Sequence, residues 1–508
     1  MQNKQFVINT ITTAVNLVIH FAISFFLTSY LVNAVGSTAY GFYGMANNIV
    51  NYALIVTNAL NSLSARFIGI GVHNKDYKSA KMYYSSVFAG DLVFALIILL
   101  PSCFAIYNLE HLIHIPSELM FEVKLLFLII FLNMCVNIVF SAFGCVYTIK
   151  NRLDITALLQ LSSNIVKSAI LIVLYVLLKP SIVYLGVATL IATLIIAFGN
   201  LFFTKKYMPE IGLDISFAKL KGIKEIVTSG IWNSLNQLSI TLLNGLDLLI
   251  ANLMVSAEAM GVLSIAGTIP GVISTFISSL SNMFTPKYLE LYSHGDYPSL
   301  LKEVKNSIRF MTVVSVMPIS FLIAFGVPFF KLWTPNTDIK MLYILSVIII
   351  LPHFSGGAIN SVNYLYTVAN KIKWPAIILL LTGVTNVVTV FVCLKFTSLG
   401  VYAIAGVSTV IGFLRNIFFN APYAARCIKK PIYTFWPDML KSLVCLLFAV
   451  AVGTVVNGLF KIDTWLKLIL IGGICTAFTG LLVAIAVLSK EQKHFVISKI
   501  KGAIQNGN

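Results

Sequence analysis

The sequence predicts an all-α integral membrane protein with about 14 transmembrane helices. Hydrophobic residues make up 58% of the 508 residues, charged residues only 10%, and the mean hydropathy is +0.91. A soluble domain carries roughly 25% charged residues, so this composition excludes a soluble protein. Long apolar runs separated by short polar gaps indicate helices and exclude the alternating strands of an outer-membrane barrel.

The apolar runs define the predicted spanning segments. A signal peptide has a shorter apolar core and a small-residue cleavage site, so we interpret the first run, near residues 8–35, as a retained helix. The other segments fall near residues 43–70, 83–107, 123–149, 155–178, 181–203, 226–253, 261–285, 307–327, 342–368, 375–395, 399–424, 441–460 and 466–488.

The net charge of +17 follows from membrane topology and does not indicate a nucleic-acid partner. If the N-terminus is cytoplasmic, most of the 35 Lys and Arg residues fall in cytoplasmic gaps, tails or the adjoining helix ends. This asymmetry is what the positive-inside rule describes. We therefore predict a multi-pass protein with cytoplasmic N- and C-termini.

Neither the cysteines nor the histidines predict a metal site. The seven cysteines are scattered, mostly inside apolar runs, without metal-ligand spacing. His111 and His114 lie three residues apart in the longest external loop, residues 108–122, but no further ligand completes a set. We interpret this loop as a polar interfacial segment. Because no gap can hold a soluble catalytic domain, we do not expect an enzyme.

The segment near residues 226–253 carries a polar stripe. An unpaired carboxylate in hydrocarbon costs about 2.5–3.5 kcal/mol even on a mild insertion scale, so the stripe faces either a packed bundle or a water-filled cavity. We favour a cavity, because the first segment carries a matching stripe that includes Asn16 and His20. At 100° per residue, one face of the later segment collects Asn233, Asn236, Gln237, Thr241, Asn244 and Asp247.

The chain also predicts an internal repeat. The separation is six segments, an even number, so both copies have the same orientation in the membrane, as in parallel-repeat transporters. We predict a lobe of helices 1–6 (residues 1–204), a lobe of helices 7–12 (205–425) around a central cavity, and two additional helices with a cytoplasmic tail (426–508). An offset of 220 residues aligns Asn16 with Asn236, Ala39 with Ala259, Gly41 with Gly261, Ala46 with Ala266, and residues 76–79 with residues 296–299.

Five charged residues lie in or near spanning segments and are candidates for the transport site. Lys167, at mid-depth, either contacts an anionic substrate group or pairs with Asp91 or Asp247. Arg415 suits phosphate because its planar fork binds two oxygens, and Arg66 is either an interfacial anchor or a substrate contact. Asp247, and with it Asp91, is a candidate for ion or proton coupling.

These features together resemble a known family. The pattern is similar to polysaccharide (O-antigen) flippases of the Wzx type, within the multidrug/oligosaccharidyl-lipid/polysaccharide exporter superfamily, and the resemblance covers nearly the whole chain. It is carried by GSTAYGFYG at 36–44, LSARF at 63–67, DY at 76–77, DLLIANLM at 247–254, EAMG at 258–261 and FTP at 284–286.

The resemblance implies translocation of an undecaprenyl-diphosphate-linked oligosaccharide from the cytoplasmic to the periplasmic leaflet of a bacterial inner membrane. The mechanism would be alternating access, coupled to an H+ or Na+ gradient and without a bound cofactor. It further implies a role in O-antigen, capsule or exopolysaccharide synthesis, with the lipid bilayer and the polysaccharide polymerase machinery as partners. On this hypothesis the substrate-binding residues are Lys167, Arg415, Arg66, Asn16, His20, Asn233, Asn236, Gln237 and Asn244.

Three alternatives stay open. A cation-coupled multidrug extruder of the same superfamily would need acidic groups for a cationic drug, whereas the buried bases here match the buried acids in number. A lipid II flippase fits the topology equally well. A membrane enzyme such as an O-antigen polymerase or ligase would be expected to carry a substantial periplasmic loop.

Overall fold

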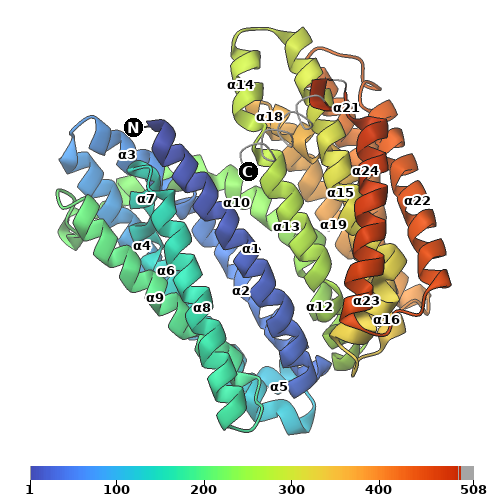
Figure 1. The fold of residues 1–508 in the computed structure, drawn as a ribbon. Helices are drawn as coiled ribbons and strands as arrows, with labels where there is room; N and C mark the ends of the chain where they lie inside the picture. The colour runs from blue at the N-terminus through green and yellow to red at the C-terminus, as the bar shows by residue number, and fades with distance from the viewer. Residues whose placement is uncertain (1, 490, 494–508) are drawn as a thin grey trace, which may run out of the picture. The chain divides into compact units, whose positions relative to one another are not determined.

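The computed structural model describes residues 2–489 and 491–493, apart from the side chains of residues 2–11, 13, 14, 16–18, 20, 56, 354–356 and 358. Within the described residues the regular elements are all helices, and no strand occurs among them (Figure 1). The predicted all-α fold is confirmed.

The number of spans is close to the predicted one. Over the described residues, 11 helical stretches are long and apolar enough to cross a membrane, and a bent pair within residues 37–73 raises the number to 12. Two shorter apolar helices, Phe21–Val35 and Ile339–Ile350, fall within the remaining two predicted segments. The predicted count of 14 is therefore approximate. The chain is a multi-pass membrane protein.

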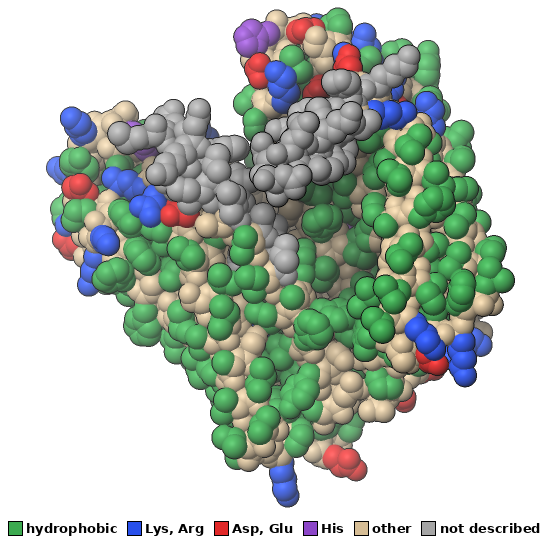
Figure 2. All heavy atoms as spheres, viewed as in Figure 1, with side chains coloured by type: hydrophobic (Ala, Val, Ile, Leu, Met, Phe, Trp, Pro, Cys, Tyr) green, Lys and Arg blue, Asp and Glu red, His purple; other side chains and the backbone are tan. Residues whose placement is uncertain are grey.

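Apolar side chains cover the flanks of the helices, while charged side chains gather toward the helix ends (Figure 2). Phe104, Val176 and Phe396 are each at least 70% exposed to the surroundings. Such exposure is unfavourable in water but suits contact with lipid tails. The surface is thus that of a bilayer protein, in agreement with the hydropathy of the sequence.

Residue contacts divide the chain into two compact units, Met1–Ser264 and Ile265–Asn508. The lobe boundaries predicted from the repeat, 204/205 and 425/426, remain a prediction. The helices of the first unit are α1 (Gln2–Val35), α2 (Ser37–Asn61), α3 (Ser64–His73), α4 (Tyr77–Tyr107), α5 (Leu109–Leu112), α6 (Met120–Ser141), α7 (Cys145–Ile149), α8 (Leu153–Leu177), α9 (Val183–Tyr207), α10 (Leu220–Ile240), α11 (Asp247–Met254) and α12 (Ala257–Ala266), which spans the boundary.

In the second unit, the predicted segment near residues 342–368 is broken into short helices. Pro352 begins α17, because its missing N–H and fixed φ suit a first helical position but not a helix interior. The α-helices of this unit are α13 (Thr268–Asn282), α14 (Thr285–Ser293), α15 (Tyr297–Trp333), α16 (Ile339–Ile350), α17 (Pro352–Ile359), α18 (Tyr364–Val368), α19 (Lys373–Phe396), α20 (Val401–Arg415), α21 (Ala421–Cys427), α22 (Trp436–Leu459), α23 (Trp465–Lys467) and α24 (Ile474–Val487).

The two units repeat the same local geometry where the sequence predicts it. Asp76 caps α4 by accepting a hydrogen bond from the Ser79 backbone N–H at 3.1 Å, and Asp296 caps α15 through Ser299 at 3.0 Å. The residue before each cap, Lys75 or Gly295, has a positive φ of 61° or 71°. Because loop, cap and left-handed residue recur at the same offset, the internal repeat extends to backbone conformation.

A second pair of similar contacts occurs in later helices of the two units. The hydroxyl of Tyr147 donates to Asn200 Oδ1 at 2.9 Å in the first unit. In the second unit, the Tyr366 hydroxyl donates to the Asn420 backbone oxygen at 2.8 Å. Both contacts link a tyrosine near the end of one span to an asparagine in a later helix.

Close packing of α2 against α10 depends on one glycine. A Cβ atom at Gly230 would overlap the backbone carbonyl oxygen of Ala59. Ser234, one turn further along α10, donates from Oγ to the Ile55 carbonyl at 2.7 Å. Small residues at such an interface let two backbones approach and hydrogen-bond, which is how membrane helices associate without a hydrophobic driving force.

Gly230→Ala is expected to lower the free energy of unfolding by about 1–3 kcal/mol, because the added methyl overpacks the α2–α10 contact. Gly271→Ala is the matched control: it gains the same helix propensity, but its Cβ meets no atom within 4 Å. Thermal unfolding of both variants in detergent measures the difference. Equal melting temperatures would refute the close contact.

Candidate functional site

The candidate site is a cavity of about 500 Å³ inside the first unit, where polar side chains stand among the apolar Val50, Leu54, Met134 and Ile138. It is formed by α2, α6 and α10, and its lining contains amides and hydroxyls but no charged side chain. Its size is that of a small-molecule pocket. The polar lining residues are Asn51, Thr57, Asn58, Asn61, Asn137, Ser141 and Gln237.

The predicted stripe on α10 does not lie in a single environment. Gln237 lines the cavity, whereas Asn233, Asn236 and Asn244 are exposed and Thr241 is buried. A π-helical turn, residues 241–245, also lies between α10 and α11 and changes the register of the residues beyond it, such as Asp247. A π-turn takes up one extra residue, so the side chains beyond it are displaced by about 100° from a regular helical wheel.

Asn233 connects the stripe to α2. Its Nδ2 donates to Ser62 Oγ at 3.1 Å, and its backbone oxygen accepts a long hydrogen bond of 3.5 Å from Asn58 Nδ2. Since Asn58 also lines the cavity, the two helices present their amides together at the cavity rim. The predicted Asn233 and Gln237 are therefore brought close to residues that the stripe did not include.

Asp91 lies near the middle of α4 and is fully buried. Its Oδ1 accepts a hydrogen bond from Asn61 Nδ2 at 2.9 Å, and its Oδ2 lies 2.8 Å from Ser141 Oγ. Ser141 Oγ also lies 2.9 Å from Asn61 Oδ1. Since Asn61 and Ser141 line the cavity, Asp91 forms a second layer behind its wall.

The three side chains form a closed ring whose hydrogen bonds require three protons. Asn61 supplies one and the Ser141 hydroxyl supplies one, which it donates either to Asp91 or to Asn61. The ring is complete only when Asp91 carries the third proton and donates it to Ser141 Oγ. An ionised Asp91 draws the serine proton and leaves two oxygens, Ser141 Oγ and Asn61 Oδ1, in contact without a proton. A change in the protonation of Asp91 therefore changes the hydrogen bonds of Asn61 and Ser141, which line the cavity.

Lys167, in α8, pairs with neither Asp91 nor Asp247. Its Nζ donates to the Tyr43 hydroxyl at 3.2 Å and lies 5.7 Å from the centre of the Tyr43 ring. None of the ion pairs found among the described residues includes Lys167. The Lys167 side chain thus contacts a phenol and has no carboxylate partner in the described part of the chain.

The remaining predicted residues of the first unit are spread along it. Asp247 begins α11, is partly buried, and has no hydrogen-bond or ion-pair partner among the described residues. Arg66 is an exposed residue of α3. The side chains of Asn16 and His20 lie outside the described residues.

Arg415 lies in the second unit, at the end of α20 and directly before a π-turn at residues 416–420. Its Nε and Nη1 are buried and have no hydrogen-bond partner among the described residues. Leaving buried donors unsatisfied is costly, so this guanidinium calls for an acceptor from outside the described chain, such as an anion or water.

No metal centre occurs among the described residues, in which no group of three potential ligands gathers. His114 is instead part of a structural contact. Its backbone N–H donates to Asn252 Oδ1 at 2.8 Å, and Asn252 Nδ2 donates to the His114 carbonyl at 2.9 Å. This exchange fastens the loop of residues 108–122 to α11 and satisfies the fully buried amide of Asn252.

The amides of α2 were not among the residues predicted for the site. Asn47, Asn51, Asn58 and Asn61 follow the spacing of one helical face, so the wheel applied to residues 37–61 would have found them. Asn137 and Ser141 lie four residues apart on α6 and give the same, weaker signal. The contact of Lys167 with Tyr43 joins residues 124 positions apart and leaves no local pattern.

Known proteins resemble the chain in sequence. A family model described as "Polysaccharide biosynthesis protein" matches residues 6–285. The chain is also 26% identical over 493 residues to EpsK of Bacillus subtilis (strain 168), described as an uncharacterized membrane protein, and the match covers 95% of this chain and 96% of EpsK.

Solved structures resemble the fold. The lipid II flippase MurJ in an inward closed conformation matches with a TM-score of 0.69 and 15% identity, covering 94% of this chain and 98% of MurJ. An inward-facing multidrug transporter of the MATE family matches with a TM-score of 0.66 and 13% identity, covering 80% and 94%. At these identities the likeness concerns the fold.

Asp91→Asn is expected to preserve stability, because an asparagine can donate to Ser141 Oγ and accept from Asn61 and so completes the ring. Asp91→Ala removes the hydrogen-bond partner of Asn61 Nδ2 and one partner of Ser141 Oγ, and should lower the free energy of unfolding by about 1–3 kcal/mol. Thermal unfolding at one pH compares the two. A greater loss for the asparagine variant would rule out the proton count.

Single cysteines should distinguish the environments along the stripe. In a cysteine-free background, Asn236→Cys and Asn244→Cys are expected to react with a small water-soluble thiol reagent, and Thr241→Cys to be protected by burial. Ile240→Cys is the control for exposure to lipid, since that side chain is 40% exposed but apolar. If Asn236 and Asn244 are as unreactive as Ile240, the stripe faces lipid or protein and not water.

Proposed function

Because the chain belongs to the polysaccharide biosynthesis protein family, we propose that it is a flippase that carries a lipid-linked oligosaccharide across the membrane. The carrier is undecaprenyl diphosphate, and transport runs from the cytoplasmic to the periplasmic leaflet of a bacterial inner membrane, with both chain termini cytoplasmic. The flipped product feeds O-antigen, capsule or exopolysaccharide synthesis, and the polymerase machinery is the next partner.

The observation that supports this proposal most is the uncharged, amide-lined cavity of the first unit. Each amide offers both donors and an acceptor, which match the paired donor and acceptor character of a sugar hydroxyl. A cation-exporting pump would be expected to present carboxylates in such a cavity. Here the nearby carboxylate, Asp91, lies behind Asn61 and Ser141.

Two cations without carboxylate partners suit the diphosphate of the carrier. The buried Nε and Nη1 of Arg415 provide two donors for phosphate oxygens. The Nζ of Lys167 contacts the Tyr43 hydroxyl and forms none of the ion pairs found among the described residues. On this proposal the sugars are recognised by neutral amides and the diphosphate by cations, and alternating access exposes both to one leaflet and then the other.

Coupling to an H+ or Na+ gradient uses Asp91 or Asp247. The Asp91 ring supports proton coupling, because gain or loss of one proton changes the bonding of two residues that line the cavity. Asp247 begins α11 two residues after the π-turn, and its carboxylate has no hydrogen-bond or ion-pair partner among the described residues, which leaves it open to a coupling ion.

A second candidate is a lipid II flippase, favoured by the full-length match of the fold to MurJ. Its substrate has the same carrier chemistry, so Arg415 and Lys167 would act as before. The two candidates differ in the sugar and peptide part of the substrate, and direct comparison of the two lipids in one assay separates them.

The proposal is tested by reconstituting the chain in liposomes with a fluorescent undecaprenyl-diphosphate oligosaccharide and measuring its arrival in the opposite leaflet. Arg415→Gln is expected to lower the initial rate by about tenfold or more, since a charge-assisted hydrogen bond is worth roughly 1.5–3 kcal/mol. Arg426→Gln is the control, because it removes the same charge at an exposed position of α21.

The control variant should flip within about twofold of the wild type. Transport of lipid II but not of the oligosaccharide lipid would replace the first candidate by the second. Efflux of organic cations without flipping of either lipid would establish a multidrug pump, and loss of transport in both arginine variants would remove the specific role of Arg415.

A further inference from the structure

A basic pocket lies in the second unit, away from every residue assigned above. It consists of two adjoining cavities of about 210 and 330 Å³, which share Arg309 and Ser489 in their linings. Its walls are residues 302–312 of α15, the start of α22, and the end of α24 with the chain directly after it. These three helices pack against one another.

The pocket lies at the depth of lipid headgroups. In α15, residues 310–330 carry no charge, and a run of about twenty helical residues spans the roughly 30 Å hydrocarbon core. Arg309 directly precedes this run and therefore marks its edge. Lys441 lies in the second turn of α22, and α24 ends at Val487. All three helix ends thus place their polar residues at one face of the membrane.

Cations outnumber acids in this pocket. The basic lining residues are Lys302, Lys305, Arg309, Lys441 and Lys493. Of the two acids, Glu491 is engaged by Lys302, whose Nζ lies 2.8 Å from Glu491 Oε1. Asp438 is buried and interacts electrostatically with Lys305, Lys441 and Arg309. The pocket therefore keeps an excess positive charge after both acids are neutralised.

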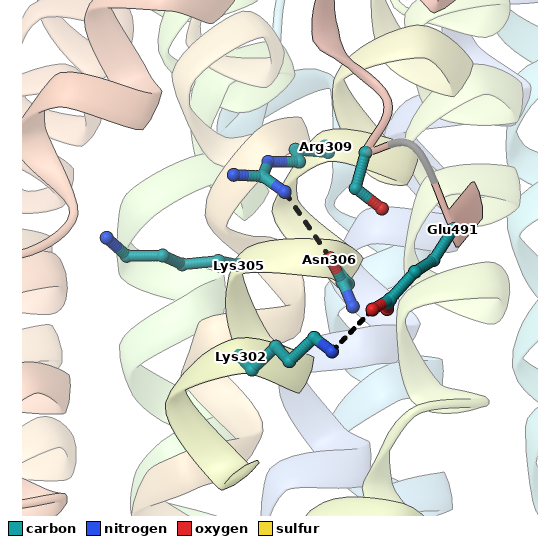
Figure 3. Close-up of a pocket in the computed structure, with 6 residues that line it drawn as sticks. Lys302, Lys305, Asn306, Arg309 and Glu491 are labelled. Carbon is teal, nitrogen blue, oxygen red and sulfur yellow. Dashed lines mark hydrogen bonds and ion pairs between the residues drawn. The ribbon is translucent and has the colours of Figure 1, made fainter. Parts of the chain in front are cut away.

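Lys305 and Arg309 form no salt bridge among the described residues, although both interact electrostatically with Asp438. Figure 3 shows Lys302 directed toward Glu491, while Lys305 and Arg309 extend to the other side of α15. Among the described residues, Arg309 makes one hydrogen bond, a long one of 3.5 Å to Asn306 Oδ1, and Lys305 makes none. Two neighbouring cations one helical turn apart are therefore available to the same ligand.

The opposite wall is held in place. Ser489 and Gln492 exchange two hydrogen bonds, at 3.1 and 3.2 Å, in the manner of a capping box. Gln492 Nε2 also donates to the Asn306 backbone oxygen at 2.9 Å, which fastens this wall to α15. The Ser489 hydroxyl accepts in this exchange and keeps its own proton for a ligand.

We propose that this pocket binds the phosphate group of an anionic membrane lipid. Arg309 and Lys305 contact the phosphate oxygens, and Lys441 and Lys493 provide the surrounding positive potential. Ala486, Val487 and Leu488 line the same cavity and offer an apolar surface to the lipid beyond its headgroup. A bound headgroup bridges α15, α22 and the end of α24, and this role does not depend on the substrate of transport.

The test measures binding of short-chain phosphatidylglycerol to the purified full-length protein in detergent, by native mass spectrometry. Lys305→Gln with Arg309→Gln is expected to weaken binding at least tenfold. The matched control, Lys205→Gln with Lys206→Gln, removes the same two charges from exposed positions in the last turn of α9 and should change binding less than twofold. If both double variants weaken binding equally, or if neither weakens it, the proposed binding site is wrong.

A second variant and two further ligands complete the test. Lys441→Gln with Lys493→Gln removes two cations from the other walls of the pocket and keeps Lys305 and Arg309, the α15 residues near Asp438. This variant should weaken binding severalfold. Phosphatidylcholine with the same chains should bind at least tenfold more weakly than phosphatidylglycerol. Competition by inorganic phosphate at the same concentration as the lipid would identify a free-phosphate site and overturn the assignment to a lipid.

Discussion

The absence of water from the hydrocarbon core is the constraint on which this structure depends. A helix satisfies its own backbone, but each polar side chain at that depth needs a partner from the protein or from a ligand. The ring of Asp91, Asn61 and Ser141 meets this need with three neutral groups when Asp91 is protonated. For the same reason, the buried donors of Arg415, which have no partner among the described residues, need an acceptor from a ligand or from water.

Helix contact in such a medium requires close approach, and small residues allow it. Gly230 lets α10 reach the backbone of α2, and Gly41 lets α2 reach α12, where a Cβ would lie 2.6 Å from Gly261 Cα. Gly41 and Gly261 are also equivalent positions of the internal repeat. Each copy thus meets its counterpart at a residue that both copies keep small, and the polar cavity lies further along the same helix α2.

Much of the fold could be predicted from the sequence. A membrane span is recognised by its length and hydropathy, and the two Asp-Tyr loops of the repeat are recognised because they lie 220 residues apart. The family resemblance was likewise readable and is confirmed by the match over residues 6–285. The candidate site could be predicted less well from the sequence. A helical wheel assumes regular geometry, so the π-turn at residues 241–245 separates Asn244 and Asp247 from the residues before it. The partners of Asp91 come from two other helices, which no local pattern connects.

On the proposed function, the distribution of charge lets one chain bind a ligand that is partly neutral and partly anionic. Buried cations are costly to hold without partners, so Lys167 and Arg415 are expected only where an anion offsets the cost. The lysines around Arg309 lie at headgroup depth, where water and a nearby surface make the same charges inexpensive. On the two proposals made above, depth separates two uses of one chemistry: a cation within the core binds the phosphate that is transported, and a cation at the interface binds the phosphate of a resident lipid.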